Sequence, residues 1–157
     1  MLRRYEQFSA VISSLNRGIQ KLEREEMVKH GYKGAYAQYL TLLRRYPEGL
    51  PLTRICDACD KDKAAVSRMI AELVEKRLVE RCTSGERVYK ARIRLTEQGS
   101  AVAEFVSARA QAAVATVNDA LTENERVAFY AALEKISGKL EILTREGIPE
   151  GEQNDKT

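Results

Sequence analysis

The chain has 157 residues, of which 44% are hydrophobic and 31% are charged, a balance typical of globular rather than disordered proteins. Its length allows one domain or two small interlocked ones, and no apolar run approaches the roughly 18 residues of a membrane span. No apolar core follows the charged start MLRRYEQF. We therefore expect no signal peptide, and three reduced cysteines in a cytoplasmic protein.

The charge is unevenly distributed along the chain. Residues 1–95 carry 20 Lys and Arg against 12 Asp and Glu, whereas residues 96–157 carry 6 against 11. A basic first part joined to an acidic last part favours a surface that faces a polyanion and a separate body. Uneven but solvated surface charge is the alternative interpretation.

The first half of the chain predicts two helices. The first is about 25 residues long and ends near Gly31, and its apolar residues recur every three or four positions. This narrow stripe, of the coiled-coil type, consists of Tyr5, Phe8, Ile12, Leu15, Ile19 and Leu22. The second helix is expected from Gly34 to Tyr46, before Pro47 and Gly49.

Two further helices are predicted on either side of a tight turn. Thr53 is the expected N-cap of a short helix from Arg54 to Cys59, after an extended Leu50–Leu52. Asp62 is the expected cap of the next helix, which runs to about Lys76. Its inner face is predicted to hold Val66, Ile70 and Leu73.

A two-stranded hairpin is predicted next, and two long helices after it. Apolar and charged residues alternate in LVERC and RVYKARIRLT around a turn at Ser84-Gly85. Thr96 is expected to cap a helix reaching about Ala120. Thr122-Glu123-Asn124-Glu125 has the form of a capping box for a helix that ends at Gly147. The polar residues 147–157 are expected to be a disordered tail.

The helices at both ends of the chain predict a homodimer. Each carries a long apolar stripe, and a chain this small offers little else for both stripes to cover. We therefore expect residues 1–33 and 97–146 to form dimerisation helices around a lobe of residues 34–96. The predicted fold class is mainly α with a small β wing.

A short helix, a turn, a second helix and a basic hairpin are together typical of a winged helix-turn-helix. A helix fits the major groove of DNA, and a hairpin with outward cations reaches an adjacent minor groove. The small side chains at 64 and 65 permit close approach to bases. The predicted DNA-binding residues are Lys61, Lys63, Ala64, Ala65, Ser67, Arg68, Arg87, Lys90 and Arg92.

The chain resembles the MarR-type winged-helix transcriptional regulators. The residues that carry the resemblance are KAAVSRMIAELVEKRLVER (63–81), then the wing and RIRLTEQG (92–99). The resemblance implies that Ser67-Arg68 matches a Thr/Ser-Arg pair of the recognition helix, and that Arg87 matches a wing-tip arginine. The chain departs from the family pattern at Arg77, where Gly is usual, and at Glu86-Arg87-Val88 of the wing tip.

The cysteines and tyrosines suggest additional sites. Cys56 and Cys59 fit core positions, but with Cys82 and the lysine-rich turn they are also candidates for thiol-based sensing. Too few soft ligands are available for a structural zinc site. Tyr36 and Tyr39 fit core packing, whereas the family resemblance implies a pocket there for a small aromatic or phenolic effector.

The sequence offers no catalytic set. It has a single histidine, and we find no phosphate-binding glycine loop and no acidic metal cluster, so we predict neither an enzyme nor a cofactor. The expected function is that of a homodimeric, ligand-responsive repressor that binds an inverted repeat in double-stranded DNA. The alternatives are a thiol-based redox sensor on the same scaffold, or a winged helix that contacts proteins and has no specific DNA partner.

Overall fold

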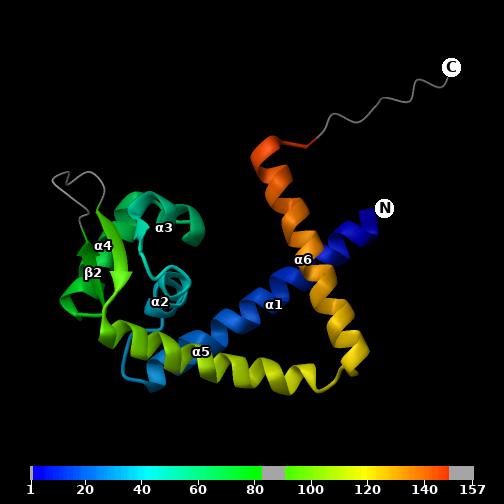
Figure 1. The fold of residues 1–157 in the computed structure, drawn as a ribbon, viewed down its shortest axis with the longest axis horizontal. Helices are drawn as coiled ribbons and strands as arrows, with labels where there is room; N and C mark the ends of the chain where they lie inside the picture. The colour runs from blue at the N-terminus through cyan, green and yellow to red at the C-terminus, as the bar shows by residue number, and fades with distance from the viewer. Residues whose placement is uncertain (1, 83–90, 149–157) are drawn as a thin grey trace. The chain divides into compact units, whose positions relative to one another are not determined.

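The computed structural model describes residues 2–82 and 91–148 (Figure 1). In these ranges the predicted fold class, mainly α with a small β wing, is confirmed. The elements in chain order are α1 (Leu2–Lys29), α2 (Tyr36–Arg44), β1 (Leu50–Pro51), α3 (Leu52–Cys59), α4 (Lys63–Glu75), β2 (Val79–Cys82), β3 (Arg92–Leu95), α5 (Glu97–Asn118) and α6 (Glu123–Glu146). The predicted turn at Ser84-Gly85 and the tail from residue 149 onward lie outside the described residues.

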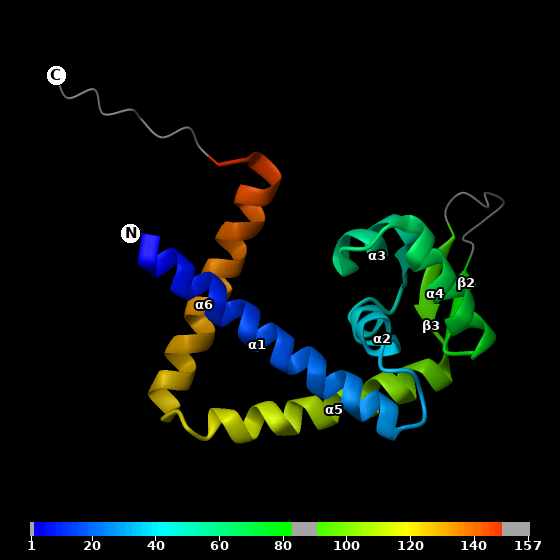
Figure 2. The ribbon, with the colours of Figure 1, turned by 180° about the vertical axis from the view of Figure 1, so that it is seen from behind.

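The chain forms two compact units, residues 1–114 and 115–157. In the first unit α2, α3, α4 and the strands gather into a lobe, which Figure 2 shows from behind. Two ion pairs join α5 to the first two helices, one from Arg109 to Glu26 of α1 and one from Glu104 to Arg44 of α2. Helix α6 lies in the second unit, and its described residues include none that is buried.

A single apolar core holds the first unit together. The predicted inner face of α4 is confirmed, since Val66, Ile70 and Leu73 are fully buried. They pack with apolar residues of the other helices and strands, among them Met27, Leu40, Leu43, Ile55, Leu78, Val79, Ile93, Val102 and Val106. Burial of this apolar surface is the main stabilising contribution to the fold.

The sheet has a strand that the sequence did not predict. Its order is β1–β3–β2, with both pairs antiparallel, and Leu50 lies opposite Ile93. The expected hairpin of two strands was therefore incomplete. A strand of two residues is too short to show an alternating pattern, and Pro51 is compatible with a sheet only at an edge.

Three helices end with the same backbone motif. In each, a residue in the left-handed conformation donates its N–H to the carbonyl of the residue three positions earlier. The next residue donates its N–H to the carbonyl of the residue five positions before it. The left-handed residues are Gly31, the predicted stop of α1, then Asp60 after α3 and Arg77 after α4. At α4 the N–H of Arg77 donates to Val74 and the N–H of Leu78 to Leu73, each at 2.9 Å.

Two predicted helix boundaries were wrong. Helix α3 begins at Leu52 with Pro51 as its N-cap residue, so Thr53 lies inside the helix. Pro51 has φ −67° and ψ 152°, an extended conformation that suits a helix entry without help from a side chain. Helix α2 is shorter than the expected Gly34–Tyr46, because residues 33–35 form a turn before Tyr36. The cap of α4 at Asp62 and the capping box at Thr122 are confirmed.

We expect Arg77→Gly to stabilise the protein by about 0.5–1 kcal/mol. Arg77 has φ 58°, a conformation that costs a residue with a Cβ more than it costs glycine, although glycine is also freer in the unfolded chain. Urea unfolding measures the change. The control is Lys76→Gly. Lys76 has φ −76°, so glycine relieves no unfavourable conformation there and this variant should only lose stability. A destabilised Arg77→Gly variant would contradict the expectation.

The start of α5 lies directly against the end of α4. Thr96, the predicted cap, accepts a hydrogen bond from the Gly99 N–H at 3.0 Å and donates its hydroxyl to the Arg77 carbonyl at 2.6 Å. The Thr96 N–H also donates to the carbonyl of Leu78 at 3.1 Å. A Cβ placed on Gly99 would lie 1.8 Å from that same Leu78 oxygen. Only glycine therefore fits here without a movement of the backbone.

Candidate nucleic-acid interface

Helix α4 is fixed at its start by the carboxylate of Asp62. This carboxylate accepts a hydrogen bond from the Ala65 backbone N–H at 2.8 Å. That bond is the largest cause that holds the pKa of Asp62 below its ordinary value of 3.8. The cap and the turn after α3 together set the direction in which α4 leaves the turn.

We expect the Asp62 cap to make stability depend on pH in the acid range. Because the pKa is lower in the folded state, the contribution is fully present above pH 3.8 and is lost as the pH falls through the lower, folded-state pKa. Asp62→Asn keeps an acceptor at the cap but does not titrate there. Thermal unfolding from pH 5 to 2.5 should show the parent losing more stability than the variant. Parallel curves would rule out this role.

The first two turns of α4 present a small, cationic face. Lys63, Ala64 and Arg68 are exposed, while Ala65 and Ser67 are half-buried between this face and the core. Lys61 in the preceding turn is also exposed. The six α4-side residues predicted to bind DNA therefore lie on one continuous stretch around the start of the helix. Among the described residues, Lys61, Lys63 and Arg68 are in no ion pair, so their charges are available to a polyanion.

The wing residues are placed only in part. Arg87 and Lys90 lie outside the described residues. The guanidinium of Arg92 donates two hydrogen bonds to the Gly49 carbonyl, from Nε at 3.1 Å and from Nη2 at 2.9 Å. Arg94 pairs with Glu80 across the sheet at 2.6 Å. Arg92 thus holds the connection before β1 onto β3, and this would limit its reach toward DNA.

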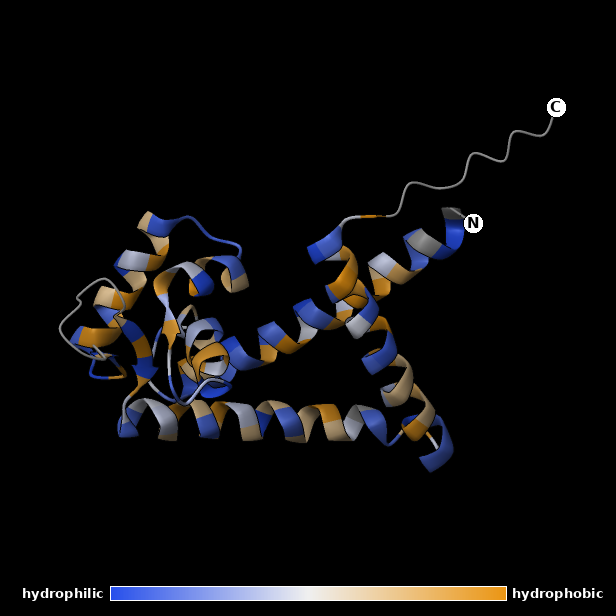
Figure 3. Cartoon of the chain, turned by 45° about the horizontal axis from the view of Figure 1, so that its top comes forward, coloured by the Kyte–Doolittle hydropathy of each residue, from blue (hydrophilic) through white to orange (hydrophobic). Residues whose placement is uncertain are grey.

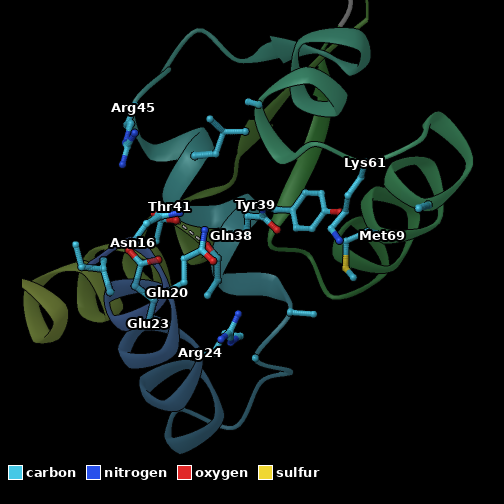
Figure 4. A pocket seen from close by; sticks show the side chains of 17 residues that line it. Asn16, Gln20, Glu23, Arg24, Gln38, Tyr39, Thr41, Arg45, Lys61 and Met69 are labelled. Carbon is cyan, nitrogen blue, oxygen red and sulfur yellow. Dashed lines mark hydrogen bonds between the residues drawn. The ribbon is translucent and has the colours of Figure 1, made fainter. Parts of the chain in front are cut away.

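A groove of about 580 Å³ lies beside the start of α4 (Figure 4). Its walls come from α1, α2, the end of α3, Lys61 in the following turn, and Ala65 and Met69 of α4. The volume suits a small molecule. Its charged lining residues are Glu23, Arg24, Arg45 and Lys61. Burial raises the pKa of Glu23 and outweighs the opposite effect of Arg45.

The two candidate pocket tyrosines are placed differently. Both side chains are buried, but Tyr39 is among the groove-lining residues, and Figure 4 shows its ring extending toward Lys61 and Met69. Tyr36 is fully buried outside the groove lining, and its hydroxyl donates to Glu72 of α4 at 2.7 Å. Burial, and then the hydrogen bond to Glu72, raise the pKa of Tyr36 to about 12. Of the two tyrosines, only Tyr39 borders the groove.

The three cysteines are free thiols. Cys59 is buried in the core, and that burial raises its pKa despite the opposing effect of Lys61. A raised pKa is the opposite of what a reactive thiolate requires. Cys56 and Cys82 are half-buried, and the Cys82 thiol lies 3.8 Å from a Glu80 carboxylate oxygen. In residues 2–82 and 91–148, no group of three or more His, Cys, Asp or Glu side chains could hold a metal.

Helices α1 and α6 expose apolar side chains (Figure 3). On α1 the exposed large apolar residues include Phe8, Val11, Ile12, Leu15 and Ile19. On α6 they include Val127, Phe129, Tyr130, Ile136, Leu140 and Ile142. Leu15 of α1 and Leu140 of α6 are each 48% exposed, and each lies within a row of exposed apolar residues on its own helix. Such patches mark surfaces that another molecule covers.

The contacts of two glutamates near this site were not predicted from the sequence. Glu72 joins α4 to Tyr36 and Lys33, and Glu23 lines the groove with Arg45. Their roles depend on contacts between helices, for which one sequence gives no periodic signal. The only hint in the sequence was Glu72 itself, an acidic residue on a helix whose exposed start is cationic.

One family model and several solved structures are similar to this chain. Residues 30–87 match the model of the MarR family. No curated protein matches the sequence significantly. Similar solved structures include the oxidized form of MarR from E. coli (22% identity, TM-score 0.66, 82% of this chain and 92% of that one). A MarR family protein from Bacillus stearothermophilus (19%, 0.72, 90% and 98%) and the S. aureus MepR–DNA complex (19%, 0.65, 85% and 97%) are also similar. At these identities the likeness is one of fold. No described helix is long and apolar enough to cross a membrane.

Proposed function

Because the chain belongs to the MarR family of winged helix-turn-helix transcriptional regulators, we propose that it is a homodimeric repressor that binds an inverted repeat in double-stranded DNA. Regulators of this family act by binding and not by catalysis. A small effector would release the repressor from its operator. We also propose that the protein is located in the cytoplasm, where it encounters its operator DNA.

The exposed start of α4 is the observation that carries the proposal. Lys63, Ala64 and Arg68 point away from a core that holds the other face of the same helix. Arginine and lysine donate to guanine or phosphate, and alanine can contact a thymine methyl group. MepR, which has a similar fold, was solved as a complex with DNA. We therefore take α4 as the recognition helix.

The apolar faces of α1 and α6 support the homodimer. A twofold pair of lobes places two recognition helices about one helical turn apart, roughly 10 base pairs, on an inverted repeat. The division proposed is therefore residues 1–33 and 97–146 for pairing and residues 34–96 for DNA. Sedimentation should give about twice the 17.7 kDa mass of one chain. A mass of one chain at micromolar concentration would contradict the dimer.

The groove is our proposed effector site. Its volume, the Tyr39 ring and its cationic residues suit a small aromatic or phenolic compound. A compound bound there would touch α1 and the recognition helix at once. It could then favour a conformation in which the spacing of the two recognition helices no longer fits the operator.

Selection of bound sequences from random duplex DNA at moderate salt tests the proposal. A regulator should enrich an inverted repeat whose half-sites are about 10 base pairs apart. Enrichment of no sequence would contradict specific DNA binding and favour a winged helix that contacts proteins. Titration of the selected duplex in rising salt then counts the phosphate contacts.

A further inference from the structure

One carboxylate on the recognition helix holds two partners from outside the helix. The Oε1 atom of Glu72 accepts a hydrogen bond from the buried Tyr36 hydroxyl at 2.7 Å, and it pairs with the ammonium group of Lys33. The Glu72 side chain is only 29% exposed. The two contacts join a mostly covered carboxylate of the recognition helix to the start of α2 and to the connection before it.

The partners of Glu72 belong to a segment that is fixed to α1. Gly31 and Tyr32 donate their backbone N–H groups to Val28 and Met27, at the end of α1. The hydroxyl of Tyr32 accepts a hydrogen bond from Gln98 at 3.0 Å. Lys33 follows immediately, and Tyr36 is the first residue of α2. The connection between α1 and α2 is therefore anchored at several points.

The recognition helix also packs through its apolar face. Helix α4 packs mainly against α3 and β2, and its buried face shares the core with α2 and with Met27 of α1. Glu72 adds to this nondirectional packing an ion pair and a hydrogen bond, which are directional contacts, to the segment that follows α1. We infer that Glu72, through Tyr36 and Lys33, is a positioning residue that fixes the recognition helix relative to α1. This inference rests on the proposed function, in which α1 carries the dimer and the recognition helix carries the DNA contacts.

The direction in which one substitution changes DNA affinity distinguishes a positioning role from a purely electrostatic effect on DNA. A carboxylate near DNA repels phosphate, so removing its charge should strengthen binding and alter the salt dependence. Removing a positioning contact should instead weaken binding to the selected operator. It should also relax the preference for half-site spacing, because a looser helix can follow a displaced half-site.

The experiment compares two matched substitutions on one helix. Glu72→Gln keeps the size of the side chain but loses the ion pair with Lys33. Glu75→Gln removes the same charge at an exposed position that, within the described ranges, has no hydrogen bond or ion pair. Dissociation constants are measured for the selected operator and for operators with one base pair added to or removed from the spacer. Circular dichroism confirms that each variant is folded at the assay temperature.

For Glu72→Gln we expect affinity for the operator to fall about two- to tenfold, the range of one or two hydrogen bonds. The penalty for altered spacing should shrink, whereas Glu75→Gln should bind as tightly as the parent or more tightly. If Glu72→Gln binds like Glu75→Gln, the inference is wrong. If the bond serves stability alone, only the unfolding midpoint will fall, and the inference is equally wrong.

A second pair of variants covers the case in which Glu72→Gln does not fold. Tyr36→Phe removes only the hydroxyl and leaves the pair of Glu72 with Lys33, so we expect a smaller relaxation of the same kind. Lys33→Met removes the other partner. If Tyr36→Phe and Lys33→Met both keep the parent's preference for half-site spacing, the inference is wrong. If the parent protein enriches no sequence, the proposed function fails. If the parent binds a specific sequence and Glu72→Gln binds it with the same affinity and spacing preference, only the inference about Glu72 fails.

Discussion

Gly99→Ala should destabilise the protein by about 3 kcal/mol or more, since the added methyl group cannot be accommodated without backbone movement. Its Cβ would lie 1.8 Å from the oxygen of Leu78 and 2.8 Å from the carbonyl carbon. That same oxygen accepts the Thr96 N–H, so a shift of Leu78 would also break the start of α5. Alanine favours helices by up to about 1 kcal/mol over glycine, and the clash has to exceed this gain.

Thermal unfolding at one protein concentration measures the effect. A loss of 3 kcal/mol corresponds to roughly a 10 °C fall in the midpoint for a chain of this size. Gly138→Ala is the matched control, because a Cβ there meets nothing within 4 Å and helix propensity alone should raise stability. Equal midpoints for Gly99→Ala and the parent would show that the contact between Gly99 and Leu78 is not close.

Arg68→Ala should reduce discrimination between the selected operator and unrelated DNA by about 10- to 100-fold. This is the range for losing one good contact to a base edge, about 1–3 kcal/mol. Arg68 is exposed two turns into the recognition helix, and no described carboxylate pairs with it. The measurement is the ratio of the dissociation constants for specific and nonspecific duplexes at a single salt concentration.

Two control variants distinguish base contact from charge. Arg17→Ala removes an exposed arginine from α1 and should leave the specificity ratio unchanged. Arg87→Ala, at the predicted wing tip, should weaken binding to all duplexes and lower the salt slope by about one. If Arg68→Ala weakened every duplex equally, Arg68 would contact phosphate and would not read sequence.

Much of the fold could be predicted because its signals are local. The stripe on α4, the cap at Asp62 and the capping box at Thr122 all depend on residues within one or two turns of each other. The order of short helix, turn, helix and strands then restricts the topology to a winged helix-turn-helix. The predicted face of α4 follows from the same periodicity that buries Val66 and Ile70.

The features that could not be predicted depend on contacts between distant segments. Strand β1 exists because Leu50 pairs with Ile93, more than 40 positions away in the chain. Arg92 was expected to face DNA, yet its guanidinium binds the Gly49 carbonyl, which only the folded sheet brings within reach. Arg77 occupies a place that usually holds glycine, and the sequence alone did not say that it adopts the left-handed conformation.

Lys61 and Ala65 belong both to the groove lining and to the proposed DNA-binding residues, so under the proposed function these two positions contact both the effector and the DNA. A substitution at either position would change effector specificity and operator specificity together. Evolution toward a new effector would therefore also change the DNA sequence that the protein binds. Asn16, Gln20 and Gln38 line the same groove from α1 and α2 and are not among the proposed DNA-binding residues. Anyone redesigning this protein as a biosensor should vary those three and leave the shared pair untouched.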